Sequence, residues 1–373
     1  MKKHSKRQQS PKARAKKTCP QTAGSITIGI DLADKTSRYC VLNQQGEVKK
    51  ESSVALTQKG VAQTFSAMPR SRIALEVGTH SPWVSRLLSS LGHEVIVANP
   101  RQLRVITESS RKDDKVDAKT LARLARIDPE LLRPIRHRGE KAQMDLMQIR
   151  VRAALVESRT SLVNTLRGLA KSVGNRVVWC DPDALDASRL EGLPTPLREV
   201  LEPLAAQVES LTGQIQQCDR KREQIARDEY PETALLKQVF GVGTLIALTF
   251  VLTVEDPQRF QQSRDVGCYV GLRPKRSQSG QNDPQLRITK EGDRYLRQLL
   301  VQGAHRIMSR RSPDTDLKLW GLKLGAHGGR NAKKRAIVAV ARKLAILLHR
   351  LWVTGEVYEP LRNQPAESGL QAA

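Results

Sequence analysis

The chain has 373 residues, a formal net charge of +25 and a sequence pI near 10.3. This excess of positive charge predicts a polyanionic partner, nucleic acid above all, with an anionic membrane surface as the competing explanation. Because only 3% of the residues are aromatic, we expect attraction to the phosphate backbone, and not base stacking, to dominate binding to nucleic acid. The five cysteines show no C-x-x-C spacing, which argues against a zinc site and a disulfide framework and favours a reducing cytoplasm. The sequence has no apolar run long enough to span a membrane and no signal-peptide core, which argues against a membrane protein.

Residues 1–24 contain eight lysines and arginines and no acidic residue, which is typical of a disordered basic arm. A solvated tail without a specific role is an equally good interpretation. From residue 25 the pattern predicts a mixed α/β domain that extends to residue 138. Its expected strands are 26–31, 37–42, 47–54, 72–77 and 93–100, its expected helices are 61–67, 81–92 and 113–127, and "NQQG" at 43–46 is an expected turn.

Residues 139–230 change to a helical pattern. Apolar residues alternate at spacings of four and three from Leu197 to Cys218, which is a heptad seam, and a weaker seam runs from Leu146 to Val163. The segment "VGNRVVWCDPDAL" separates the two helices. We therefore expect an antiparallel helical hairpin or coiled coil, with dimerisation through it as a plausible addition.

A third segment, residues 231–355, is expected to be a helical domain, followed by a disordered tail at 356–373. Its "GVG" at Gly241–Gly243 resembles a helix-hairpin-helix turn, whose backbone N–H groups can meet a phosphate, although an ordinary tight turn is the commoner case. The last helix carries an apolar stripe through Val340 and Leu344, which should pack inward, and the basic residues Lys333, Lys334 and Arg335, which should face DNA phosphates.

Four carboxylates have positions that suggest a metal site. Asp31 ends the first strand, Glu76 lies near the end of "IALEVG", and Asp114 and Asp117 are one turn apart at the start of a helix. Oxygen ligands of this kind suit Mg²⁺ or Mn²⁺, and two-metal phosphoryl transfer uses them. Each carboxylate also has a plain interpretation, as a turn residue, a surface residue or a first-turn partner of the helix dipole.

The stretch "GLRPKRSQSGQNDPQLRITKEGDRYLRQLL" predicts a basic loop followed by a helix whose N-terminus can hold a phosphate. A serine in this loop would need a metal or cationic neighbours to become a nucleophile, because no histidine is close in sequence. An ordinary loop that contacts the DNA backbone is the alternative. The residues expected to contact nucleic acid here are Arg273, Lys275, Arg276, Thr289 and Lys290.

The order Asp31, Glu76, then "DDKVDAKT" resembles the RuvC-like, ribonuclease H-type domain of the DEDD transposases, the insertion-sequence 110 family of bridge-RNA-guided recombinases. The stretch "FGVGTLIALTFVLTVEDPQRFQQSRDVGCYVGLRP" and the later "SQSG" and "ITKEGDRYLRQLLVQGA" are similar to the second domain of that family. The resemblance covers roughly residues 25–350. Phe240 stands where the family usually has proline, and "NDPQLRITK" departs where a small residue often precedes the isoleucine.

The resemblance implies a DNA recombinase that excises and inserts its own mobile element. It implies that Asp31, Glu76, Asp114 and Asp117 are the catalytic carboxylates and that Ser279 is the catalytic serine. Ser277 is the reserve candidate, because the loop could present either serine. It also implies donor and target DNA and a structured non-coding RNA as partners, a homodimer or homotetramer, no membrane, and a bacterial cytoplasm with nucleoid association during action.

Two other readings are open at this stage. A catalytically dead or hydrolytic RuvC-like protein would bind or cut nucleic acid without rejoining it. An actin-like ATPase or sugar kinase is suggested by "IGIDLADKT", which resembles the first phosphate loop of that group. However, no second phosphate loop appears, and a charge of +25 is hard to reconcile with that class.

Overall fold

Residues 26–99, 114–280, 282–284, 286–326, 329 and 331–363 are described by the computed structural model, with only the backbone described at 114–116. The expected basic arm, the end of the strand predicted at 93–100 and the chain after 363 lie outside these residues. The chain divides after His137 into two compact units, each described by itself below. The predicted first boundary, at residue 138, differs from this division by one residue.

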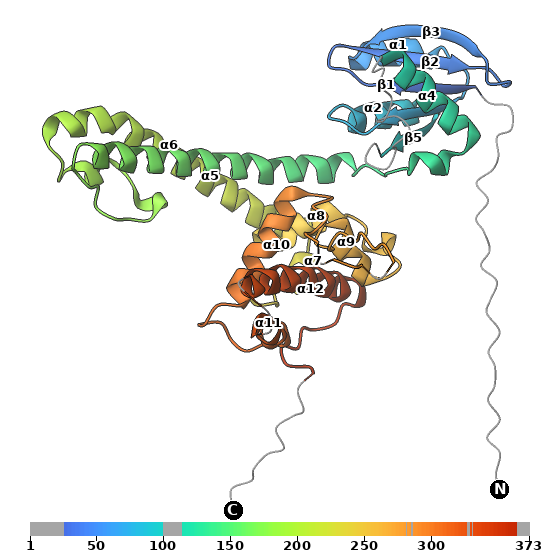
Figure 1. Ribbon diagram of the computed structural model, residues 1–373. Coiled ribbons are helices and arrows are strands. Elements are labelled where there is room, and N and C mark those ends of the chain that lie inside the picture. Colours follow the sequence, from blue (N-terminus) through green and yellow to red (C-terminus); the bar gives the residue numbers. More distant parts are fainter. Residues whose placement is uncertain are drawn as a thin grey trace, which may run out of the picture. The chain divides into compact units, whose positions relative to one another are not determined.

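The N-terminal unit contains a five-stranded mixed sheet with the order β3-β2-β1-β4-β5 (Figure 1). β1 pairs antiparallel with β2 and parallel with β4, and β5 pairs parallel with β4. The elements are β1 (Thr27–Asp31), β2 (Thr36–Leu42), β3 (Val48–Ala55), α1 (Gln58–Ser66), β4 (Arg72–Glu76), α2 (Ser81–Ser90), β5 (Glu94–Ala98) and α4 (Asp114–Ile127). The predicted mixed α/β domain is confirmed.

The strands and helices of this unit lie close to their predicted positions because alternation of apolar residues is a local signal. α1 begins three residues earlier than predicted, since the Thr57 hydroxyl caps it by accepting a hydrogen bond of 3.0 Å from the Gly60 amide. The predicted turn at 43–46 is also confirmed: the Gly46 amide donates to the Asn43 carbonyl at 3.0 Å, and Gly46 has φ of 85°.

Two hydrophobic cores cover the two faces of this sheet. On one face, Val61 and Phe65 of α1 and Leu88 of α2 pack with Ile30 and Tyr39. On the other face, α4 packs through Ala118, Leu121, Ala122 and Ala125, which recur at helical spacing. The α4 face is the one that carries the predicted carboxylates.

The C-terminal unit is helical (Figure 1). Its helices are α5 (Glu140–Ser172), α6 (Thr195–Asp228), α7 (Glu232–Leu236), α8 (Thr244–Val254), α9 (Val266–Tyr269), α10 (Arg294–Ile307), α11 (Asp316–Ala326) and α12 (Ala332–Thr354). α5 and α6 form an antiparallel pair, because Leu166 of α5 packs with the start of α6 and Leu146 with its end. Coiled-coil packing of the pair stays a prediction.

The remaining helices gather around α8 and α12. α8 is buried on nearly all sides, and α12 contributes Val340, Leu344 and Leu348 to the same core, as predicted for its apolar stripe. Leu248 and Leu252 of α8 also pack against α5 and α6. The helical hairpin and the C-terminal segment, predicted as separate domains, therefore share one compact unit.

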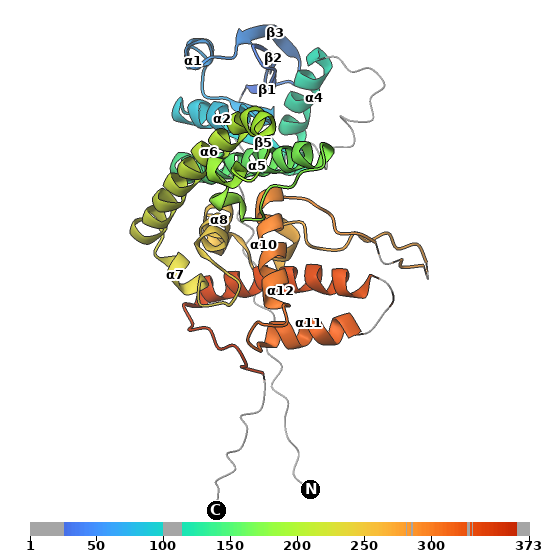
Figure 2. The same ribbon diagram turned by 90° about the vertical axis from the view of Figure 1, so that its left-hand side faces the viewer.

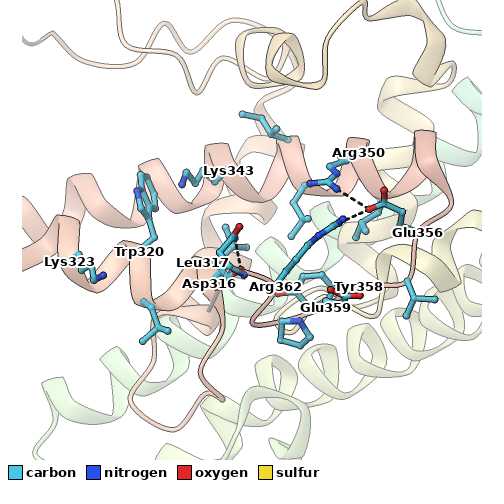
Figure 3. A pocket seen from close by; sticks show the side chains of 17 residues that line it. Asp316, Leu317, Trp320, Lys323, Lys343, Arg350, Glu356, Tyr358, Glu359 and Arg362 are labelled. Carbon is cyan, nitrogen blue, oxygen red and sulfur yellow. Dashed lines mark hydrogen bonds and ion pairs between the residues drawn. The ribbon is translucent and has the colours of Figure 1, made fainter. Parts of the chain in front are cut away.

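Residues 356–363 differ from the disordered tail predicted for 356–373. Glu356 accepts hydrogen bonds from Arg350 at 3.0 Å and Arg362 at 2.8 Å, as Figure 3 shows. The Asp316 amide donates to the Pro360 carbonyl at 2.7 Å, and the half-buried Tyr358 packs on the main core. The prediction was wrong here because these bonds depend on α11 and α12, which a local reading of composition does not include.

These residues line one side of an open cavity of about 520 Å³ between α11 and α12 (Figure 3). Its wall includes Leu317, Trp320 and Leu351, and the Lys343 ammonium lies 3.8 Å from the centre of the Trp320 ring. Arg350 and Arg362 on its rim share Glu356. Several charged side chains on its wall already pair with one another or with an aromatic ring, so we place the candidate active site elsewhere. Among the described residues, no helix is long and apolar enough to cross a membrane.

Candidate active site

α4 lies directly against β1 because the strand has glycine at the crossing point. A Cβ atom on Gly29 would come within 2.0 Å of the Ala118 carbonyl oxygen and 2.6 Å of the Ala122 nitrogen. Ala74, the register partner of Gly29 on β4, packs with Leu121 and Ala125 of the same helix. Small residues on both strands therefore allow the helix backbone to approach the sheet closely.

Asp31 and Glu76 end neighbouring parallel strands on the same face. Ile30 and Leu75 are register partners, and the two acidic residues follow them directly. Side chains two residues apart on a strand share a face, so Asp31 lies on the face of Gly29 and Glu76 on the face of Ala74. Both half-buried carboxylates thus belong to the α4 face, at the carboxyl ends of β1 and β4.

The direction of α4 brings its first turn toward the carboxyl ends of β1 and β4. The last turn of α4 lies near the amino ends of these strands, because Arg72, at the start of β4, donates to the Ala125 carbonyl at 3.3 Å. Ala118 already lies over Gly29, so the helix positions before Ala118 continue toward Asp31. Asp117 is half-buried, and Asp114 begins the helix one turn before Ala118. The fold therefore gathers the predicted acidic positions at one end of one sheet face.

The donor set has the right chemistry for a hard divalent cation but is incomplete in the described part of the chain. Carboxylate oxygens are the ligands that Mg²⁺ and Mn²⁺ prefer. Among the described side chains, however, no three His, Cys, Asp or Glu residues lie close enough together to hold a metal ion. The side chain of Asp114 lies outside the described residues.

The chain between α9 and α10 forms a β-hairpin that projects away from the helices (Figure 2), and the backbone bridge between Ser279 and Asn282 lies near its tip. The arms are joined where the Lys275 amide donates to the Arg287 carbonyl at 2.8 Å and where the Thr289 amide donates to the Arg273 carbonyl at 2.8 Å. At the tip, Ser279 and Asn282 exchange two backbone hydrogen bonds of 3.0 Å. Gly280 follows with φ of 57°, a conformation that two-residue hairpin turns require. The hairpin presents its serine outward.

The hairpin is exposed and basic, and its contact with a nucleic-acid backbone stays a prediction. Every residue from Arg273 to Gly280 is exposed, Ser277 included. Arg276 forms an ion pair of 3.5 Å with Asp283 across the hairpin, whereas Arg273 and Lys275 pair with no described residue. The Ser279 hydroxyl forms no hydrogen bond with the described residues, so the hairpin does not itself supply a base.

The helix that follows the hairpin is not an open phosphate site, contrary to the sequence-based expectation. α10 begins at Arg294, and the Asp293 carboxylate accepts a hydrogen bond of 2.9 Å from the Leu296 amide. The same carboxylate accepts a hydrogen bond of 2.8 Å from Arg150 of α5. A carboxylate therefore already occupies the place where an anion would bind, so the prediction was wrong.

The "GVG" turn joins α7 to α8, and its glycines have different surroundings. Gly241 has φ of 85° and packs against α10, where a Cβ atom would lie 2.9 Å from the Gly303 carbonyl. The Val242 amide already donates to the Val239 carbonyl. Gly243 is exposed with open space around it at the start of α8. Packing explains Gly241, while phosphate contact at Gly243 stays a prediction.

Three basic side chains lie at the start of α12. Lys333, Lys334 and Arg335 are all exposed in its first turn. The positive end of the helix dipole disfavours cations at this place. Three cations at this unfavourable place are consistent with the prediction that an external anion, such as a phosphate, is their partner.

Comparison with known proteins gives the family. The family model described as "Transposase" of the DEDD IS110 type matches residues 28–174, and "Transposase IS116/IS110/IS902 family" matches residues 233–318. The chain is 31% identical over 376 residues to "Putative transposase y4rJ" of Sinorhizobium fredii, with 90% of this chain and 94% of the relative covered. The chain belongs to the IS110 family of transposases.

Other IS110-type relatives agree with this assignment. The transposase for insertion sequence element IS1111A of Coxiella burnetii is 26% identical over 339 residues, which cover 89% of this chain and 90% of the relative. "Putative transposase y4pF/y4sB" of Sinorhizobium fredii is 29% identical and covers 94% of this chain. As a transposase of this family, the chain is a DNA-cutting enzyme. The first family match contains the four predicted acidic residues and the second contains Ser279.

Sequence reasoning missed one residue beside the carboxylates, Arg38 of β2. Arg38 is the register partner of Asp31. Its position depends on how the strands pair around the loop at 32–35, and no periodic signal in the sequence gives that pairing. The residue could have been found only by fixing the register of β1 against β2.

Proposed function

We propose that this IS110-family transposase excises and inserts its own mobile element with the acidic end of the α4 face as one half of its catalytic machinery. The observation that carries the proposal is the juxtaposition of Asp31 and Glu76 at the ends of adjacent parallel strands, with the first turn of α4 directed toward them. Carboxylates at neighbouring strand ends supply the oxygen ligands that metal-assisted phosphodiester chemistry uses.

Asp31, Glu76, Asp114 and Asp117 would hold Mg²⁺ or Mn²⁺. A bound ion of this kind would neutralise charge on the oxygens of a reacting phosphate. The shared face of the described carboxylates and their oxygen chemistry support the assignment, and Asp114 would complete the set from the first helical turn. The role of the chain is to fix these oxygens on rigid strands and a helix.

The second half is the hydroxyl of Ser279. In the proposed step the Ser279 oxygen forms a bond to phosphorus, and the bond from phosphorus to one strand oxygen breaks. A base outside the hairpin takes the serine proton and passes it to the leaving strand oxygen, so that this strand leaves as a free hydroxyl. Because the phosphoserine ester keeps the energy of the broken bond, a strand hydroxyl can reverse the step and join DNA, which hydrolysis by water could not do.

A structured RNA from the element would select the donor and target DNA. The net charge of +25 and the low aromatic content support a partner bound through its phosphates. The exposed cations of the hairpin and of the start of α12 give two basic surfaces for such partners. We propose action as a homodimer or homotetramer in the bacterial cytoplasm.

The test is covalent capture of DNA. Purified protein with its RNA is mixed with labelled DNA from the element end and run on denaturing electrophoresis. We expect an adduct with the parent protein and none with Ser279→Ala, which should still bind nucleic acid because Arg273, Lys275 and Arg276 remain. Ser277→Ala is the matched control from the same hairpin and should form the adduct.

The other outcomes are equally clear. An adduct with Ser279→Ala but not with Ser277→Ala would move the nucleophile to Ser277. An adduct with both variants would refute the serine mechanism in this hairpin. Cut DNA with no adduct from the parent protein would instead favour the hydrolytic nuclease.

A further inference from the structure

The sheet register forms a row of side chains across the α4 face at the acidic end. Ser53 pairs with Arg38, and Arg38 pairs with Asp31. Glu76 lies next in the row, on β4, because it follows Leu75, the register partner of Ile30. Glu76 in turn pairs with Ala98 of β5. Directly opposed residues of an antiparallel pair have their Cβ atoms about 4.5–5.5 Å apart. One arginine therefore lies next to the first of the proposed metal-binding carboxylates.

Two observations place Arg38 on that face. Cys40, two residues later on β2, packs with Ala118 and Ala122 of α4, and side chains two apart share a face. Arg38 also lines a small cavity of about 160 Å³ together with Cys40, Glu51 and Ala118. The guanidinium therefore belongs to the side of the sheet that carries Asp31 and Glu76.

Arg38 has no partner in the part of the chain that the structure describes. Its side chain is exposed, and no hydrogen bond or ion pair joins its guanidinium to a described residue. Arg72, at the other end of the same sheet, instead forms an ion pair of 3.1 Å with Glu94 and donates to a carbonyl. A structural arginine is usually engaged in this way, so an unengaged one beside carboxylates points to an external anion.

We propose that Arg38 binds a non-bridging oxygen of the DNA phosphate that reacts at these carboxylates. The inference rests on the proposed function and adds a specific substrate contact to it. Guanidinium is always charged, and its planar fork matches the two oxygens of a phosphate. The carboxylates would otherwise repel the DNA backbone, so a cation in the same row gives the strand a fixed place to dock.

The experiment compares Arg38→Gln, Arg38→Lys and Lys50→Gln in the full-length protein with its RNA. Lys50 is the matched control because it is exposed on β3 and pairs with Val41, which packs on the opposite face of the sheet. Three quantities are measured: the rate of strand cleavage, the Mg²⁺ concentration for half-maximal rate, and the dependence of DNA affinity on salt.

We expect Arg38→Gln to lower the cleavage rate about 100-fold, as the loss of one transition-state donor does. The half-maximal Mg²⁺ concentration and the melting temperature should stay unchanged. The slope of log affinity against log salt concentration should decrease in magnitude by about one, which corresponds to the loss of one phosphate contact. Arg38→Lys should recover part of the rate. Lys50→Gln should match the parent in all three quantities.

A cleavage rate for Arg38→Gln within about threefold of the parent would overturn the inference. So would a loss that high Mg²⁺ fully restores, because Arg38 would then act only on the carboxylates. Asp31→Ala, measured alongside, distinguishes a failure of the Arg38 inference from a failure of the proposed carboxylate site. If Asp31→Ala is inactive and Arg38→Gln is active, only the role of Arg38 fails, whereas an active Asp31→Ala protein refutes the carboxylate site itself.

Discussion

Gly29 of β1 lies directly beneath Ala118 of α4, so closely that a Cβ atom on the glycine would be 2.0 Å from the alanine carbonyl oxygen. The contact is between two backbones, and no side-chain movement can relieve it. It fixes the distance between the sheet and the helix whose first turn carries Asp114 and Asp117. The geometry of the acidic end therefore depends on a residue with no chemistry of its own.

Gly29→Ala should destabilise the N-terminal unit by at least about 2 kcal/mol, because α4 must move away from the sheet. It should also lower DNA cleavage by more than the loss of folded protein explains. Urea denaturation and a cleavage assay corrected for folded fraction would measure both effects. Gly78→Ala is the control, since nothing lies within 4 Å of the added carbon. Equal stability of the two variants would contradict the close packing.

Asp31→Ala, Glu76→Ala and Asp117→Ala should each abolish recombination and leave the fold intact. Without metal, each variant should melt at a higher temperature than the parent, because repulsion among the carboxylates is relieved. With Mg²⁺, the parent alone should gain stability from ion binding. Melting curves with and without Mg²⁺ and a recombination assay test this, with Glu51→Gln on the same sheet face as control. A variant that recombines at a near-parental rate would remove its residue from the site.

The protein should co-purify with a defined RNA from its own element. The net charge of +25 and the scarcity of aromatic side chains favour a phosphate-bound partner, and its release should depend steeply on salt. Protein isolated from a strain with the native flanking DNA would be extracted under nuclease-free conditions and its RNA sequenced. Random host fragments alone would count against RNA guidance.

The two ion pairs of Asp219, one with Arg152 of α5 and one with Arg222 of α6, predict a pH dependence of stability. Burial raises the pKa of Asp219, but hydrogen bonds and charges from Arg152 and Arg222 outweigh burial and hold the pKa below its ordinary value of 3.8. The stabilisation is therefore complete above the pKa of the unfolded chain and disappears as the pH falls through the lower pKa of the folded protein.

Asp219→Asn should accordingly cost about 1–2 kcal/mol at pH 7, and the difference from the parent should shrink as the pH falls below about 4. Denaturant unfolding of both proteins between pH 3 and pH 7 measures it. Asp228→Asn removes the exposed pair with Arg227 and should change stability by less than about 0.5 kcal/mol. A difference for Asp219→Asn that grows in acid would reverse the assigned sign.

Residues 356–363 should contribute to the stability of the C-terminal unit. A chain ending at Gly355 should lose about 2 kcal/mol relative to a chain ending at Asn363, because Tyr358 leaves the core and Arg350 loses Glu356. Its melting temperature should fall by about 4–8 °C. Differential scanning calorimetry of the two chains is the measurement. Equal melting temperatures would mean that this segment packs without stabilising the unit.

Much of this protein is determined by local patterns in the sequence. Alternating apolar residues located the strands of the N-terminal unit to within a few residues, and the helix predicted at 113–127 corresponds to α4 (Asp114–Ile127). The motif order around Asp31, Glu76 and Ser279 was sufficient for the family. These signals are readable because an element's period depends only on its own residues and the face it buries.

Tertiary structure decided what no periodic pattern contains. Strand order and register put Arg38 beside Asp31, although seven positions separate them in the chain. The Asp293 carboxylate caps the N-terminus of α10 and accepts a hydrogen bond from Arg150 of α5. Residues 356–363 pack on the C-terminal unit through hydrogen bonds to Arg350 and Asp316. Each of these contacts joins residues from different elements, so its energy exists only after the elements have packed, and a reading of one segment at a time cannot include it.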